Sequence, residues 1–208
     1  MAKRPLIIAT GNAHKVAEMH AQLEPWFEVR GLPANYAEPE EDGATFAANA
    51  RIKAETAAQR LNALCLADDS GLVVDALNGA PGIFSARYAG AQGDDEANND
   101  KLLDALSEVP DAQRSARFIC ALSLATPDGE IASFEGAFEG RVGRARRGDN
   151  GFGYDPLFEL PDGRTSAELA PAEKQACSHR GIALAHLAQA LNTTDLLARC
   201  IDPKPHSD

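Results

Sequence analysis

Two adjacent carboxylates, Asp68 and Asp69, directly follow a short apolar run, Leu64–Ala67. A short, bounded apolar run is typical of a buried strand, so both acids are expected at its carboxyl end, where open α/β sheets bind ligands. Because side chains alternate faces along an extended chain, one aspartate can face a ligand while its neighbour faces the other way. Such carboxylates could hold a divalent cation or take a proton from water, although a polar turn between strands is the alternative interpretation.

A turn with an early lysine follows the first apolar run of the chain. Leu6–Ala9 predicts a short strand, and Thr10–Lys15 then leads into apolar residues at helical spacing as far as Leu23. Amide groups at the start of a helix favour anions, and the lysine adds a full positive charge. The spacing is not that of a Walker loop, so the turn is either a phosphate site or an ordinary connection.

A second group of candidates lies in the last third of the chain. Gly151–Pro156 places Phe152 between two glycines, where its ring could lie against a flat ligand or anchor the turn in the core. The glycine order is wrong for a dinucleotide fingerprint. Lys174 falls in a predicted helix, and His179–Arg180 falls in the first turn of the last long helix, which Ser178 can cap. Cations there oppose the helix dipole, so stability alone does not explain them.

An acidic loop and a helix connect the early turn to the aspartates. Residues 28–43 are acidic and broken by prolines, and most of these acids are expected to be solvated. Thr45 can cap the helix that follows, on which Asn49 and Lys53 share a face. Glu41 could be purely structural, because an acid just before a helix complements the helix dipole.

The middle of the chain is expected to be richer in strands. Ser115–Ala125 alternates apolar and polar residues, Pro127–Gly129 predicts a turn, and Glu130–Phe138 predicts the returning strand of a hairpin. This β-rich stretch, roughly 115–160, could form a lobe within a single domain, 1–208.

The charge of the chain excludes some partners. Its 208 residues carry a net charge of −11, which repels nucleic-acid phosphates and anionic membrane surfaces. A polyphosphate ligand would therefore need local cations or a divalent metal. The four cysteines lack metal-ligand spacing, and those in apolar runs are expected to be buried and reduced. No run resembles a signal peptide or a transmembrane span, so a cytoplasmic location is expected.

Four motifs, in matching order over about residues 6–190, resemble those of the inosine triphosphate pyrophosphatase family. They are Thr10–Lys15; Asp68–Gly71 with Gly79–Gly82 and Ser85–Tyr88; Gly151–Pro156; and Ser178–Arg180. The resemblance implies an α/β fold in which helices flank a central twisted mixed sheet. It also implies two lobes with the active-site cleft between them, and a homodimer.

The same resemblance implies an enzyme that hydrolyses ITP, dITP and XTP to the monophosphate and pyrophosphate with Mg²⁺, clearing deaminated purines from the nucleotide pool. Asp69 would be the general base and, with Glu41, a metal ligand; Lys53 would lie near the phosphates. The substrate-binding residues that it implies are Thr10, Gly11, Asn12, Ala13, His14, Lys15, Ser70, Phe152, Gly153, Tyr154, Asp155, Lys174, His179 and Arg180.

These residue types suit that chemistry. Attack at the α-phosphorus requires positive charge on the phosphate oxygens, and a carboxylate beside the metal can deprotonate water; either Asp68 or Asp69 could take the proton. Hypoxanthine and xanthine present a 6-oxo acceptor where adenine presents a donor, so donors such as Arg180 would select them. Phe152 is the first candidate to stack on the purine, with Trp26 and Tyr154 as alternatives.

The chain departs from the family pattern at two places. Ala48 precedes Asn49 where the family usually has an acid, which would matter if that acid touches the metal. Arg146–Gly148 stands where the family tends to have proline, which is expected to add charge and loosen the loop. Two other functions stay open: a nucleotide-binding regulatory protein without turnover, and a pyrophosphatase for other modified triphosphates such as dUTP.

Overall fold

The structure is a computed structural model that describes residues 3–201, and it contains one six-stranded sheet. The strand order is β2-β1-β3-β4-β5-β6, with the bounds β1 Arg4–Ile8, β2 Phe27–Gly31, β3 Cys65–Val74, β4 Ser115–Thr126, β5 Gly129–Val142 and β6 Phe158–Glu159. The helices are α1 Ala13–Leu23, α2 Phe46–Leu61, α3 Asp95–Ala105, α4 Pro171–Cys177, α5 His179–Thr193 and α6 Leu196–Ile201. Because β1 pairs in parallel with β2 and β3 whereas β5 and β6 are antiparallel, the sheet is mixed, as predicted.

The chain divides into two compact units, each of which is described by itself. The first comprises residues 3–69, 121–135 and 183–201, and the second comprises residues 70–120 and 136–182. The tip of the β4–β5 hairpin belongs to the first unit and its base to the second. The hairpin itself is present, and β5 runs on to Val142, whose N–H donates to the Arg114 carbonyl at 2.9 Å.

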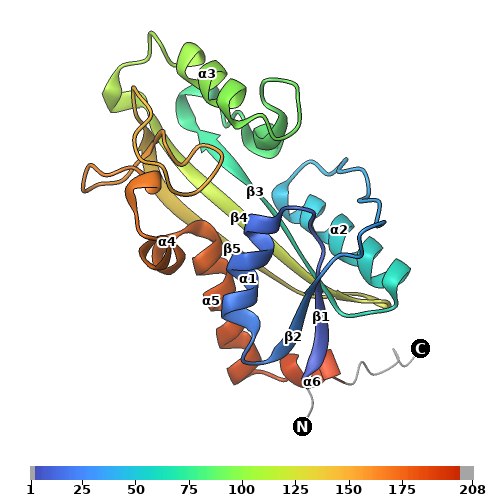
Figure 1. Ribbon diagram of the computed structural model, residues 1–208. Helices are drawn as coiled ribbons and strands as arrows, with labels where there is room; N and C mark the ends of the chain where they lie inside the picture. Colours follow the sequence, from blue (N-terminus) through green and yellow to red (C-terminus); the bar gives the residue numbers. More distant parts are fainter. Residues whose placement is uncertain (1–2, 202–208) are drawn as a thin grey trace. The chain divides into compact units, whose positions relative to one another are not determined.

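In the first unit, α1 and α2 lie on opposite sides of the parallel strands (Figure 1). One face of α2 consists of the fully buried Ala50, Ala54, Ala57 and Ala58, and the last three of these cluster with Cys65 and Ala67 of β3. Both helices begin at polar caps. The Asn12 side chain accepts from the amides of His14 and Lys15, and the predicted Thr45 cap accepts from the amide of Ala48.

The strand that carries the two aspartates is longer than predicted. β3 continues through Asp68 and Asp69 to Val74, so the acids lie within the strand rather than at its carboxyl end. A strand can bury two successive carboxylates when each finds a cation on its own side, and the helices on the two sides supply one lysine each. The predicted alternation of the two side chains is therefore confirmed.

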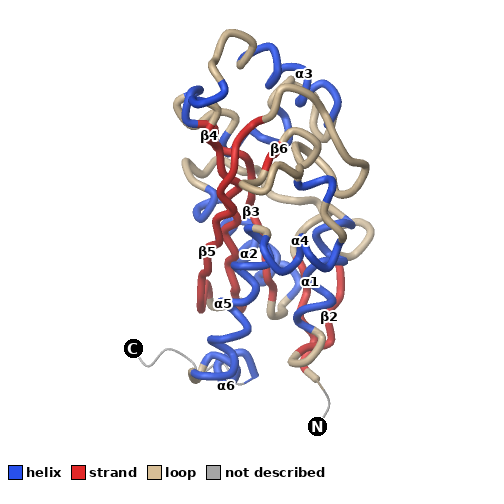
Figure 2. Tube along the Cα trace, turned by 90° about the vertical axis from the view of Figure 1, so that its left-hand side faces the viewer, coloured by secondary structure: helices blue, strands red, loops and turns tan. Residues whose placement is uncertain are grey.

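The second unit surrounds an apolar cluster whose largest members are Phe118, Tyr154 and Phe158. The segment between β5 and β6 has no helix or strand and is drawn as loop in Figure 2. Close packing explains why the motif that begins at Asp68 has a glycine at position 71. A Cβ there would lie 2.4 Å from Ser85 Oγ and 2.6 Å from the Gly82 carbonyl. Cys65 and Cys120 are buried and reduced, as expected. None of the helices in residues 3–201 has the length and apolar composition needed to cross a membrane.

Candidate functional site

In the first unit, a single lysine contacts two carboxylates. Lys53 Nζ on α2 lies 3.1 Å from Asp69 Oδ1 and 3.2 Å from Glu41 Oε1. Asn49, one helical turn earlier, donates from Nδ2 to Asp69 Oδ2 at 3.2 Å and accepts the Gly43 amide at 2.8 Å. Asn49, Lys53 and Asp69 are all less than 10% exposed. The shared helix face predicted for Asn49 and Lys53 thus serves to hold Asp69 in place.

The other aspartate has its own lysine. Lys15, in the first turn of α1, forms an ion pair with Asp68, which is fully buried. The sequence had left Asp68 open as an alternative to Asp69 for taking the proton, and its pairing with Lys15 was not predicted. Because successive side chains of β3 point to opposite faces, each aspartate pairs with a lysine from a different helix.

Burial and neighbouring charges shift the pKa values of Lys53 and Asp69 in opposite directions. Burial lowers the pKa of the Lys53 ammonium, but the carboxylates of Asp69, Glu41 and Asp68 together raise it above its ordinary value. Burial raises the pKa of the Asp69 carboxyl, and the neighbouring Lys53 offsets this only in part. The result is a carboxylate that holds a proton more readily than an exposed aspartate does.

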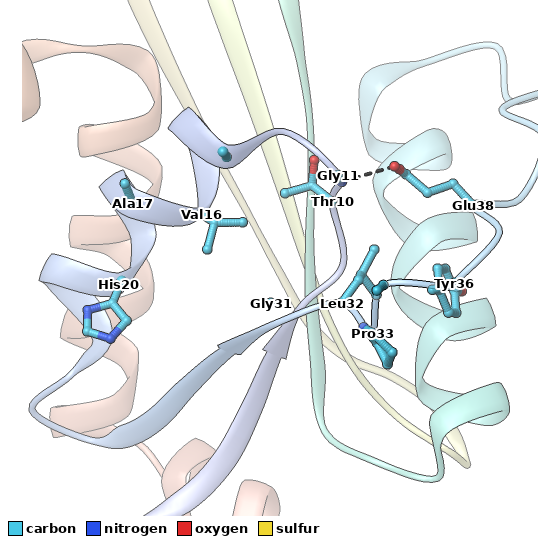
Figure 3. Close-up of a pocket in the computed structure, with 12 residues that line it drawn as sticks. Thr10, Gly11, Val16, Ala17, His20, Gly31, Leu32, Pro33, Tyr36 and Glu38 are labelled. Carbon is cyan, nitrogen blue, oxygen red and sulfur yellow. Dashed lines mark hydrogen bonds between the residues drawn. The ribbon is translucent and has the colours of Figure 1, made fainter.

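In the turn predicted to bind phosphate, a backbone amide already binds a carboxylate. The Gly11 amide donates to Glu38 Oε1 at 3.0 Å, as Figure 3 shows. Beside this bond lies an open pocket of about 530 Å³ lined by Thr10, Gly11, Ala13, Val16, Ala17, His20, Gly31, Leu32, Pro33, Ala34, Tyr36 and Glu38. The Glu38 side chain is exposed, so a phosphate oxygen could replace its carboxylate at the amide.

In the second unit, Phe152 lies under two cations. Lys174 Nζ is 5.0 Å from the centroid of its ring, and Arg180 Cζ is 5.9 Å from it. Both cations are largely buried, with 9% and 2% of their surface exposed. Arg180 also donates from Nη2 to Ser70 Oγ at 3.0 Å, and Ser70 directly follows Asp69 in β3. The arrangement offers an aromatic face together with buried hydrogen-bond donors.

Asp155 organises the loop that presents this ring. Its carboxylate accepts from the Phe152 amide at 2.9 Å, from Ser166 Oγ at 2.7 Å and from Lys174 Nζ at 2.5 Å. A Cβ at Gly151, whose φ is +81°, would lie 2.2 Å from Asp155 Oδ2. Both carboxylate oxygens accept hydrogen bonds inside the protein, so this aspartate fixes the conformation of the loop.

Three further residues of the predicted motifs, Ser178, His179 and Tyr154, also lie in the second unit. The Ser178 hydroxyl accepts the Gly181 amide at 3.1 Å, which confirms the predicted cap, and the His179 ring stacks on Phe118 with centroids 4.9 Å apart. Tyr154 is buried and donates from its hydroxyl to the Ser85 carbonyl at 2.8 Å, so its ring belongs to the core. Trp26, the other alternative for stacking, lies in the first unit and donates to Asn192.

The structure corrects one expectation about the departures from the family pattern. Arg146 does not loosen its loop, because it donates to Asp100 Oδ1 at 2.9 Å and to the Glu96 carbonyl at 3.0 Å on α3. Its basic neighbours Arg141, Arg144 and Arg147 are also paired with acids. At the other departure, the Ala48 amide donates to the Thr45 hydroxyl.

The carboxylates of the first unit fit a magnesium ion that is shared with a substrate. Within residues 3–201, no group of three or more His, Cys, Asp or Glu side chains could form a complete metal cage. Asp69 and Glu41 nevertheless converge on one cationic nitrogen, so their oxygens can face a positive charge together. Mg²⁺ commonly takes one or two carboxylates and completes its coordination with phosphates and water.

Comparisons with known proteins agree with the predicted family. The model of the Ham1 family matches residues 6–190. A dITP/XTP pyrophosphatase of Exiguobacterium sibiricum is 50% identical over 193 residues, which cover 90% of this chain and 97% of that protein. One of Nocardia farcinica is 47% identical over 199 residues, covering 92% of this chain and 96% of that protein.

Solved structures give the same result. The Ham1 protein of Staphylococcus aureus superposes with a TM-score of 0.82 at 41% identity, covering 91% of this chain and 98% of the other. A HAM1 protein from Coxiella burnetii has a TM-score of 0.82 at 43% identity, covering 92% and 99%. Since the family model and these relatives extend over nearly the whole length, the chain belongs to the Ham1 family.

Proposed function

We propose that this protein hydrolyses deaminated purine nucleoside triphosphates, namely ITP, dITP and XTP, to the monophosphate and pyrophosphate with Mg²⁺. The observation that carries the proposal is the convergence of Asp69 and Glu41 on Lys53 Nζ, at 3.1 and 3.2 Å. Carboxylates that can hold a metal and a lysine that can neutralise phosphate oxygens are groups that suit phosphoryl chemistry. The names of the curated relatives supply the substrate class.

In this proposal the first unit handles the triphosphate. Lys15 and Lys53 neutralise phosphate oxygens, and the Gly11 amide exchanges the Glu38 carboxylate for a phosphate oxygen. Asp69 accepts the proton of the attacking water, for which it must be ionised. A bound Mg²⁺, held by Asp69 and Glu41, supplies Lewis-acid stabilisation of the charge that develops on the phosphates and on the leaving pyrophosphate.

The second unit handles the base. Phe152 offers a face for stacking, and Arg180 and Lys174 offer buried donors that match a 6-oxo group. Adenine would place an amino donor against these donors and leave them unpaired, which a site of this kind penalises strongly.

The decisive test is a substrate panel of ITP, XTP, GTP, ATP and dUTP, each with and without Mg²⁺, with pyrophosphate as the measured product. The proposal requires that kcat/KM for ITP and XTP exceed that for ATP and GTP, and that turnover depend on the metal. Binding of ITP without product would instead identify a regulatory nucleotide-binding protein. Preference for dUTP would identify a pyrophosphatase of another class.

The family resemblance also supports a homodimer as part of the proposal. Light scattering coupled to size-exclusion chromatography tests it, and the mass of a single chain, 22.0 kDa, would contradict it.

A further inference from the structure

Two side chains of α3 hold both polar backbone groups of Gly153. Asp95 Oδ2 accepts the Gly153 amide at 2.7 Å, and Asn99 Nδ2 donates to the Gly153 carbonyl at 2.8 Å. The same Nδ2 also donates to the Asp95 carbonyl at 2.8 Å. The three residues therefore form a closed set of hydrogen bonds, named here the α3 clamp.

Helix stability explains one member of the α3 clamp but not the other. Asp95 lies in the first turn of α3, where an acid complements the helix dipole. Asn99 lies in the interior of the helix, where asparagine is a poor helix former. It is only 2% exposed, and its Oδ1 has no hydrogen-bond partner among the described residues. A buried amide with an unsatisfied oxygen is costly, so its donor bond to Gly153 must offset that cost.

The α3 clamp acts on the backbone of Phe152. The Gly153 amide belongs to the peptide that links it to Phe152, and its carbonyl belongs to the peptide that links it to Tyr154. Gly153 has a φ of +62°, a conformation that few residues adopt. On the other side, the Phe152 amide donates to Asp155 Oδ2 at 2.9 Å. Hydrogen bonds thus fix Phe152 from both sides and leave its ring beneath Lys174.

We propose that Asp95 and Asn99 are positioning residues that preorganise the Phe152 ring for the purine. The inference rests on the proposed function, because it assigns to α3 control over the affinity for the base. Both side chains bind the backbone of Gly153, so the effect is transmitted to the ring through the Gly153 peptides. Holding a stacking ring in its bound orientation before the ligand arrives strengthens binding, since less freedom is lost on association.

The test compares four variants of the full-length protein. Asp95→Ala and Asn99→Leu remove the two bonds to Gly153, whereas Asp95→Asn keeps an acceptor and should behave like the wild type. Asp94→Ala is the matched control, because it removes the cap of the same helix, where Asp94 Oδ1 accepts the Ala97 amide at 3.0 Å, without touching Gly153. Thermal unfolding of all four shows whether each variant is folded.

The first measurement is hydrogen exchange of the Gly153 amide, which requires no substrate. Asp95→Ala and Asn99→Leu should speed this exchange by about tenfold or more, whereas Asp94→Ala should not. The second is the affinity for inosine monophosphate without metal, measured by calorimetry. It should fall about tenfold in the same two variants, the effect of about one hydrogen bond. In turnover of ITP, KM should rise by a similar factor while kcat stays within about twofold.

The outcomes separate this inference from the proposed reaction. If the wild type binds inosine monophosphate but does not hydrolyse ITP, the reaction is wrong and the positioning role stands on the binding data. If ITP is hydrolysed but both variants keep wild-type affinity, the positioning role is wrong. Unchanged exchange of Gly153, an equal effect of Asp94→Ala, or a wild type that binds no purine would each overturn the inference.

Discussion

The Lys53 ammonium lies 3.1 Å from the Asp69 carboxylate, and both residues are less than 10% exposed. A buried aspartate would tend to take up a proton, and a buried lysine would tend to lose one. Each therefore keeps the other charged inside the protein. Lys53 thus opposes the protonation of Asp69 that burial favours, which supports a role for Asp69 as a base.

We expect Lys53→Met to destabilise the protein strongly at pH 7. The variant leaves the buried Asp69 beside the partly exposed Glu41 without their cation, and stranding a buried charge typically costs roughly 3–5 kcal/mol. Without Lys53, the pKa of Asp69 should rise further, so protonation would relieve part of the loss at pH 5. Chemical denaturation at the two pH values measures both effects.

The control for this variant is on the same helix. Arg51 forms a solvent-accessible pair with Glu55 one turn away, at 2.9 Å, and such pairs add little to stability, so Arg51→Met should destabilise the protein far less than Lys53→Met. Equal losses for Lys53→Met and Arg51→Met, or no gain at lower pH, would contradict the role assigned to the buried pair.

The pH dependence of activity should reflect the raised pKa of Asp69. Because burial raises this pKa above its ordinary value of 3.8, kcat/KM for ITP should fall on the acid side at a higher pH than an exposed aspartate would give. The same shift has a consequence for stability. The folded state binds the proton more tightly than the unfolded state, so Asp69 contributes less stability as the pH rises from the unfolded pKa through the folded one.

Asp69→Asn provides the comparison for this pH profile. The variant should bind ITP but lose about 10²–10⁴-fold in kcat, because the amide cannot accept the proton. A variant that keeps near-normal turnover, or a wild-type profile with its acid limb near 3.8, would remove Asp69 from the proposed role.

Much of this arrangement could be predicted from local pattern. The caps at Thr45 and Ser178, the shared face of Asn49 and Lys53, and the alternation of Asp68 and Asp69 depend on spacing alone. Each was confirmed because helix and strand periods fix which neighbours share a face.

What the sequence did not show depends on contacts between distant segments. β3 continues beyond Asp69 because lysines from two helices pair with the buried aspartates. The polarity of the neighbouring residues in the sequence does not reveal these distant partners. Asn99 lies among acidic residues in a stretch that resembles a solvated helix, yet its partner Gly153 is 54 residues away. Arg146 was expected to loosen its loop for the same reason, since Asp100 is 46 residues distant.

The ion pair of Lys15 and Asp68 allows binding and stability to be separated. Lys15→Met alone should raise KM for ITP and also destabilise the protein, because Asp68 is fully buried and would lose its cation. The double variant Lys15→Met/Asp68→Asn replaces the buried carboxylate with a neutral amide. Stability should therefore largely recover, while KM for ITP stays high. Recovery of both properties, or an unchanged KM in the single variant, would exclude Lys15 from phosphate binding.

Gly151 and Gly163 separate backbone strain from steric conflict in the loop around Phe152. Both have positive φ, +81° and +87°, but a Cβ at Gly151 would overlap Asp155 Oδ2 whereas none of the described atoms lies within 4 Å of one at Gly163. Gly163→Ala should therefore cost about 1 kcal/mol of stability from the backbone alone. Gly151→Ala should cost more stability, because it must also displace the carboxylate that binds the Phe152 amide and Lys174.

If the Asp155 carboxylate orients the Phe152 ring, Gly151→Ala should also weaken binding of inosine monophosphate, whereas Gly163→Ala should not. Equal affinities in calorimetry would mean that Asp155 stabilises the loop without setting the position of Phe152.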